Sequence, residues 1–200
     1  TGQNKNGTHL IILFASLLLA GNSLAGAETG SGTQGFPDGS NIVIGRSFNL
    51  SSKILPGPVR VDIALPDDYP GSNGRFPVMY AFQSSLAMAG GVAGAMAGAG
   101  AAPPIIVVSV GIDPELFSLV AEEGRPNSGS APTLLRFLRE ELWPKIDSCY
   151  RTVPFRIMLG HSSSSLFAIW ALFTAPDAIQ AVLAAGPMFA EVDYPRVMGM

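Results

Sequence analysis

The stretch IMLGHSSSSLFAIW, residues 157–170, decides the fold of this chain. An apolar run leads into Gly160-His161-Ser162, and a long apolar segment follows. This is the pattern of a nucleophile elbow, in which a strand turns sharply into a helix and exposes one serine. A serine at this point could also simply cap a helix. The apolar strand before it and the buried helix after it favour the elbow, with Ser162 as the candidate nucleophile.

The sharp turn limits the size of the residues on either side of Ser162. Positions two before and two after the nucleophile need very small side chains. Gly160 meets this demand, whereas Ser164 meets it only in part. We therefore expect the Ser164 side chain to crowd the turn and Ser164→Gly to keep or raise activity. Ser163, in the first helical turn, is the candidate donor of a backbone amide to an oxyanion.

Short apolar runs upstream and downstream of the elbow predict the rest of the sheet. They do not alternate with polar residues, so they indicate central parallel strands covered on both faces. The expected inner strands are residues 77–82, 105–110, 156–159 and 181–185. Residues 41–50 and 59–65 are further candidate strands, and the alternation in the second indicates a place near an edge. With helices between these runs, the sequence predicts an α/β fold, a three-layer α/β/α sandwich.

The intervening segments predict helices of different quality. Residues 86–102 are almost wholly Ala, Gly and Met, which predicts a loosely formed covering helix. The next helix begins near Ser130 and carries an apolar face, and we expect Pro144 to end or kink it.

Cys149 is the sole cysteine, so no internal disulfide can form, and we interpret it as a small buried residue.

Two motifs resemble a known family. Asp147-Ser148-Cys149-Tyr150-Arg151-Thr152 and the following Arg156 to Ser162 are similar to esterases of the α/β-hydrolase superfamily, the enterobactin-esterase-like and esterase D-like hydrolases. The resemblance spans residues 42–189. It implies an α/β-hydrolase fold, a small-molecule carboxylic ester as substrate, an acyl-enzyme at Ser162, and neither a metal nor another cofactor.

The resemblance also locates a second oxyanion donor. It implies a backbone amide in the loop after residues 77–82, at Gln83 or Ser84. This chain departs from the family pattern here, because the family has Asp-Gly where this chain has Gln83-Ser84. It departs again after the nucleophile, where Ser164 and Ser165 replace two glycines. A catalytically inactive binding protein of the same fold therefore stays an alternative, as does an acyltransferase.

A serine nucleophile needs a base, usually histidine. His9 lies in the N-terminal segment, and His161 is adjacent to Ser162, so neither fits. In α/β-hydrolases the order is Ser, then acid, then His. We therefore interpret the chain as a fragment and expect the acid and the histidine after Met200. Asp193 and Asp177 are weaker candidates for the acid.

Composition and the N-terminus indicate where the chain acts. The net charge is −3 and no Lys/Arg cluster occurs, which argues against a nucleic-acid partner. Residues 1–27 have the pattern of a signal peptide, with cleavage before Glu28, and its apolar run is too short for a stable membrane span. A retained N-terminal anchor is the alternative. Residues 28–40 read as a flexible linker and 41–200 as an incomplete hydrolase domain, secreted or periplasmic.

Overall fold

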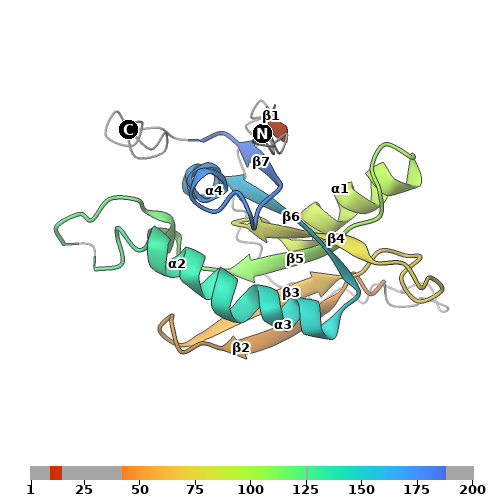
Figure 1. Cartoon of the computed structure of the whole chain (residues 1–200), viewed down its shortest axis with the longest axis horizontal. Helices are drawn as coiled ribbons and strands as arrows, with labels where there is room; N and C mark the ends of the chain where they lie inside the picture. The colour runs from red at the N-terminus through yellow and green to blue at the C-terminus, as the bar shows by residue number, and fades with distance from the viewer. Residues whose placement is uncertain (1–9, 15–41, 125, 188–200) are drawn as a thin grey trace, which may run out of the picture.

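The computed structural model describes residues 10–14, 42–124 and 126–187, and residues 10–14 by their backbone alone. Within these ranges a seven-stranded sheet has the order β1-β7-β6-β4-β5-β3-β2 (Figure 1). Its strands are β1 (Leu10–Phe14), β2 (Arg46–Ser51), β3 (Pro58–Ala64), β4 (Phe76–Phe82), β5 (Ile106–Gly111), β6 (Thr152–His161) and β7 (Ala181–Ala185). The helical segments are α1 (Leu86–Gly98), η1 (Pro114–Phe117), α2 (Ala131–Phe137), η2 (Leu138–Leu142), α3 (Trp143–Cys149) and α4 (Ser163–Thr174).

The four expected inner strands are neighbours and run parallel. β4 pairs in parallel with β5 on one side and with β6 on the other, and β6 pairs in parallel with β7. β3 joins β5 in antiparallel fashion, and β2 joins β3 in the same way. The prediction of a parallel centre with the 59–65 strand near an edge is therefore confirmed.

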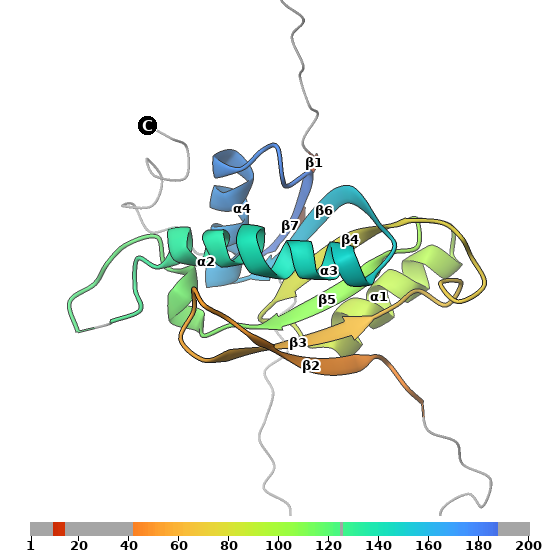
Figure 2. The same cartoon turned by 60° about the horizontal axis from the view of Figure 1, so that its bottom comes forward.

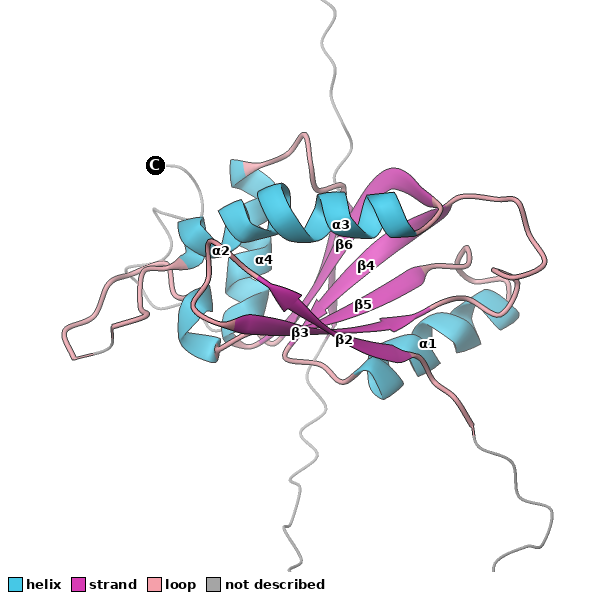
Figure 3. Ribbon diagram, turned by 90° about the horizontal axis from the view of Figure 1, so that it is seen from below, coloured by secondary structure: helices cyan, strands magenta, loops and turns pink. Residues whose placement is uncertain are grey.

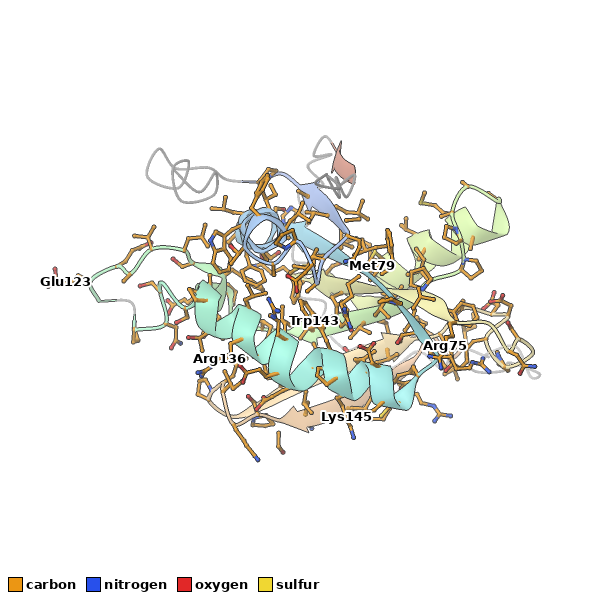
Figure 4. The ribbon with its side chains drawn as sticks, in the orientation of Figure 1. Arg75, Met79, Glu123, Arg136, Trp143 and Lys145 are labelled. Carbon is orange, nitrogen blue, oxygen red and sulfur yellow. The ribbon has the colours of Figure 1, made fainter. Side chains whose placement is uncertain are left out.

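Helices cover both faces of this sheet, as the three-layer prediction requires. Helices α2, α3 and α4 lie on one face and α1 on the other (Figures 2 and 3). Trp143 of α3 is buried and reaches toward the sheet, whereas Lys145 of the same helix is exposed (Figure 4). The second face is covered more thinly, because Ala89 is the buried residue of the small-residue helix α1.

The helix predicted to end or kink at Pro144 continues past it. α2, the π-helical turn η2 and α3 follow one another without a break from Ala131 to Cys149. Trp143 donates its backbone N–H to Leu138 O, the wider bond that characterises a π turn. Pro144 then stands in the first turn of α3, where its missing N–H costs little.

Cys149 is exposed, so the interpretation as a buried residue is wrong. The buried face of α3 is set by Trp143 and Ile146, three residues apart. Cys149 would continue that spacing, but it stands at the last residue of the helix, where the chain already leaves for β6. The helix end therefore leaves its side chain in solvent.

The motif residues Asp147, Thr152 and Arg156 tie α3 to the start of β6. Thr152 Oγ1 donates to Asp147 Oδ1 at 2.8 Å, and Arg156 Nη2 bonds Asp147 Oδ2 at 2.5 Å. Beneath them, burial raises the pKa of the Tyr80 phenol far above its ordinary value, and the negative charge of Asp147 adds to this effect. Tyr80 therefore stays neutral, and the charges here belong to the Asp147–Arg156 pair.

The expected N-terminal segments are only partly described. Leu10–Phe14, inside the predicted signal peptide, pairs in parallel with β7 as β1. The rest of residues 1–27 and the predicted linker 28–40 lie outside the described residues. In the described part of the chain, no helix combines the length and the apolarity needed to cross a bilayer.

An aromatic cluster beneath the elbow makes the fold testable. Phe82, Phe117 and Phe167 are buried, with ring centroids 5.7–5.9 Å apart. We expect Phe167→Ala to lower the free energy of unfolding by about 3–5 kcal/mol, because it leaves a cavity in this cluster. Urea denaturation is the measurement. Phe173→Ala is the matched control on the same helix: Phe173 is 51% exposed, so a change within about 0.5 kcal/mol is expected. Equal losses in both variants would contradict this packing.

Candidate active site

The site forms where three parallel strands end side by side. Leu159 of β6 is in register with Ala81 of β4, and His161 of β6 is in register with Ala185 of β7. The loop after β4, the turn after β6 and the residues after β7 therefore meet at one edge of the sheet. In open α/β sheets, ligands bind at this carboxyl edge.

Ser162 stands alone at the turn between β6 and α4. Its backbone has φ 55° and ψ −120°, a conformation that non-glycine residues rarely adopt. Its N–H donates to Ala185 O at 3.0 Å, and its carbonyl accepts from Ser165 N at 3.0 Å. The side chain is half-buried, with Ser163 to Ser165 already inside the helix. The strand, turn and helix of the predicted elbow are thus present with Ser162 at the tip.

Gly160 is needed because the turn doubles back against it. A Cβ at Gly160 would lie 2.5 Å from the carbonyl carbon of Ser164 and 2.6 Å from Ser165 N, and closer still to Ser164 O. These are backbone atoms of the first turn of α4, so they cannot move aside as a flexible side chain would. The expectation of a very small residue here is confirmed.

Ser164 does not crowd the turn, which corrects the expectation from sequence. Its side chain is fully buried, and its Oγ accepts the His161 N–H at 2.8 Å. The same Oγ lies 2.9 Å from His161 O and 3.3 Å from Phe82 O, the acceptors for its proton. The hydroxyl thus bonds the ends of both β4 and β6. Ser164→Gly would remove these bonds rather than relieve a clash.

The other two serines also hold α4 to the sheet. Ser163 Oγ donates to Gln83 Oε1 at 3.3 Å, in the loop after β4. Ser165 Oγ donates to Ala185 O at 2.9 Å, at the end of β7. The serine run therefore links the start of the helix to all three strand ends.

The loop after β4 lies against the N-terminus of α4. Gln83 has φ 53°, and among the described residues only Ser162 shares a positive φ without being glycine. The Gln83 Oε1 accepts from Ser164 N at 3.3 Å. Ser84 O accepts from Ser109 Oγ at 2.7 Å, which fixes the loop to β5. The structure thus brings Gln83 to Ser163, and Ser84 follows Gln83 in the same loop. The side-chain contact of Gln83 has no signal in the sequence.

The described residues contain the candidate nucleophile Ser162, but none of them is placed to act as its base. His161 is exposed and adjacent to Ser162 in the chain. Asp177 bonds Arg139 at 3.3 Å beyond the far end of α4, a helix of 12 residues and therefore about 18 Å long. Asp177 is thus too far from Ser162 to serve as the acid. His9 and Asp193 lie outside the described residues, which also contain no His/Cys/Asp/Glu group suited to a metal ion.

The sheet order, the covering helices and the elbow together define an α/β-hydrolase-type fold. The family model described as "Putative esterase" matches residues 52–195, well over half of the chain. The chain therefore belongs to this esterase family.

Individual relatives agree with this assignment. The ferri-bacillibactin esterase BesA of Bacillus subtilis (strain 168) is 38% identical over 63 residues, which is 31% of this chain and 22% of BesA. An IroE-like serine hydrolase from Shewanella oneidensis superposes with a TM-score of 0.68 at 24% identity, covering 78% of this chain and 55% of that chain. The BES protein of Bacillus cereus gives 0.69 at 21% identity, covering 84% and 70%. These two likenesses establish the fold, and the chain spans only part of the length of each relative.

The closed turn can be tested through Gly160. We expect Gly160→Ala to lower the free energy of unfolding by about 3 kcal/mol, since its Cβ meets backbone atoms. Thermal or urea denaturation measures the change. Gly94→Ala in α1 is the control, because nothing lies within 4 Å of its Cβ. That variant is expected to gain about 0.5–1 kcal/mol from helix propensity. A Gly160→Ala protein as stable as the parent would contradict the geometry of the elbow.

Proposed function

We propose that this protein is a serine esterase that cleaves carboxylic esters through an acyl-enzyme at Ser162. The backbone of Ser162 carries the proposal: a non-glycine residue is held at positive φ, at the carboxyl edge of a parallel sheet, before a helix N-terminus. Strained backbone of this kind concentrates at functional sites. Membership of the esterase family supports the same reaction.

In the proposed reaction, Ser162 Oγ attacks the ester carbonyl while a base takes its proton. The carbonyl oxygen becomes an oxyanion, which the backbone amide of Ser163 and an amide of Gln83 or Ser84 stabilise. The positive end of α4 adds to this stabilisation. Collapse of the intermediate expels the alcohol and leaves the acyl-enzyme, which water then hydrolyses. The base and its acidic partner belong outside the described residues.

The substrate we propose is a small-molecule ester of the siderophore type. BesA is named for ferri-bacillibactin, and its matching segment supports this choice. A panel of ferri-bacillibactin, other siderophore esters and simple aryl esters, with release of acid followed by chromatography, distinguishes this class from general esterase activity. Adding alcohol acceptors to the same assay detects the acyltransferase alternative as a new ester product.

The inactive alternative rests on two departures, Gln83-Ser84 after β4 and Ser164-Ser165 in place of glycines; the structure bears on the second. Both side chains are buried and hydrogen-bonded, and the elbow keeps its shape around them. This observation favours a working elbow over a degenerate one.

We also propose that the chain is exported, to the periplasm or the medium. The charge-free apolar run and the small residues Ala25-Gly26-Ala27 support a signal peptide. Cleavage before Glu28 would remove β1 from the edge of β7. N-terminal sequencing of the exported protein is expected to begin at Glu28; a mature chain that still carries residues 10–14 would contradict cleavage.

The nucleophile can be identified by covalent labelling of the full-length protein with a fluorophosphonate probe. Ser162→Ala is expected to abolish labelling and to lower kcat by about five to six orders of magnitude. Ser163→Ala and Ser165→Ala are the controls, and both should still be labelled because their hydroxyls bond other segments. Labelling that persists in Ser162→Ala would overturn the assignment.

A further inference from the structure

Helix α4 begins without a cap from its own N-cap residue. Ser162 occupies the N-cap position, but its side chain makes no capping hydrogen bond. A serine there normally accepts a hydrogen bond from an amide in the first turn. The backbone of Ser162, at φ 55°, instead suits a nucleophile at the tip of the turn. Ser165 N and Leu166 N bond Ser162 O, so Ser164 N needs an acceptor from another segment.

Gln83 supplies that acceptor from a segment about 80 residues away in the chain. Its Oε1 lies 3.3 Å from Ser164 N and 3.3 Å from Ser163 Oγ. The link is reciprocal, since Ser164 Oγ lies 3.3 Å from the carbonyl of Phe82, the residue before Gln83. The Gln83 side chain thus contacts the backbone of Ser164, and the Ser164 side chain contacts the backbone of Phe82. These contacts, which we call the 83–164 clasp, join the two segments that carry the candidate oxyanion donors.

The chemistry of the clasp matters as much as its position. A glutamine amide is neutral, so it satisfies an N–H without adding a negative charge. The positive end of the helix dipole therefore remains available to a developing oxyanion. A carboxylate in the same place would cap the helix at least as well, but it would repel that oxyanion.

We propose that the Gln83 side chain is a positioning residue of the active site, holding the oxyanion donors of the loop and of α4 in register through a neutral cap. This role rests on the proposed ester hydrolysis at Ser162. It concerns the side chain of Gln83, whereas the oxyanion role expected in this loop concerns a backbone amide.

Two nearly isosteric variants separate positioning from simple stabilisation. Gln83→Met removes the acceptor, and we expect lower stability together with a kcat lowered on the order of tenfold and a KM close to the parent's. Gln83→Glu keeps an acceptor and adds charge, so we expect unchanged or higher stability but a kcat again lowered on the order of tenfold. The opposite movement of stability and kcat in Gln83→Glu is a result that a purely structural cap would not produce.

Gln180→Met is the matched control. Gln180 Oε1 accepts from Arg156 N at 2.8 Å, before the amino end of β7 and away from the elbow. This variant loses two hydrogen bonds between a glutamine side chain and the backbone, the second from Gln180 Nε2 to Asp177 O at 3.3 Å. It should lower stability without changing kcat. The measurements are urea denaturation and steady-state kinetics on an aryl ester with the full-length protein.

The results of these experiments distinguish a failure of the positioning role of Gln83 from a failure of the proposed ester hydrolysis at Ser162. An active parent with an unchanged kcat in Gln83→Glu or Gln83→Met would overturn the positioning role alone. A parent that neither hydrolyses esters nor is labelled at Ser162 would overturn the proposed function, and the positioning role with it. An equal loss of kcat in Gln180→Met would show that any such lost bond slows the enzyme, which would also overturn the role given to Gln83.

Discussion

The close approach of Gly160 to the backbone of Ser164 is the constraint on which the site depends. Because no side chain separates these segments, β6 can turn into α4 within one residue. That tight reversal forces Ser162 to a positive φ and directs the helix N-terminus to the same edge of the sheet. The ends of β4 and β7 then pack against a turn that is already closed. Any residue larger than glycine at position 160 would separate the strand from the helix and move every group that follows.

The serine run 162–165 looks repetitive in sequence but has four different surroundings. Ser162 is at the tip of the turn, Ser163 bonds the loop after β4, Ser164 bonds the end of β6, and Ser165 bonds the end of β7. The hydroxyls of Ser163 to Ser165 make the helix start part of the sheet edge. A glycine at position 164 or 165 could not make these bonds, so the departure from the family pattern is a different way of holding the same turn.

The central sheet could be predicted from sequence because its signal is local. Residues 77–82 and 181–185 are unbroken apolar runs, and they match β4 and β7 within a residue. The sequence signal for the elbow was equally local, since the glycine, the serine and the flanking apolar segments are contiguous. The contact between Gln83 and Ser164 could not be predicted, because it joins residues 81 positions apart through a polar side chain in a loop. The exposure of Cys149 was missed, and of the two outcomes expected at Pro144 the end of the helix does not occur, because the preceding turn widens instead. Each result depends on where a helical turn ends or widens, which residue type alone does not determine.

The positive φ angles of the non-glycine residues Ser162 and Gln83 imply that stability and activity favour different residues at this edge of the sheet. Ser162 and Gln83 each occupy backbone conformations that cost about 1–3 kcal/mol for a residue with a side chain. Glycine adopts such angles without that cost. A library sorted only for resistance to heat or protease would therefore enrich glycine at these two positions. The most stable variants of that library would lack the hydroxyl at position 162 and the amide side chain at position 83.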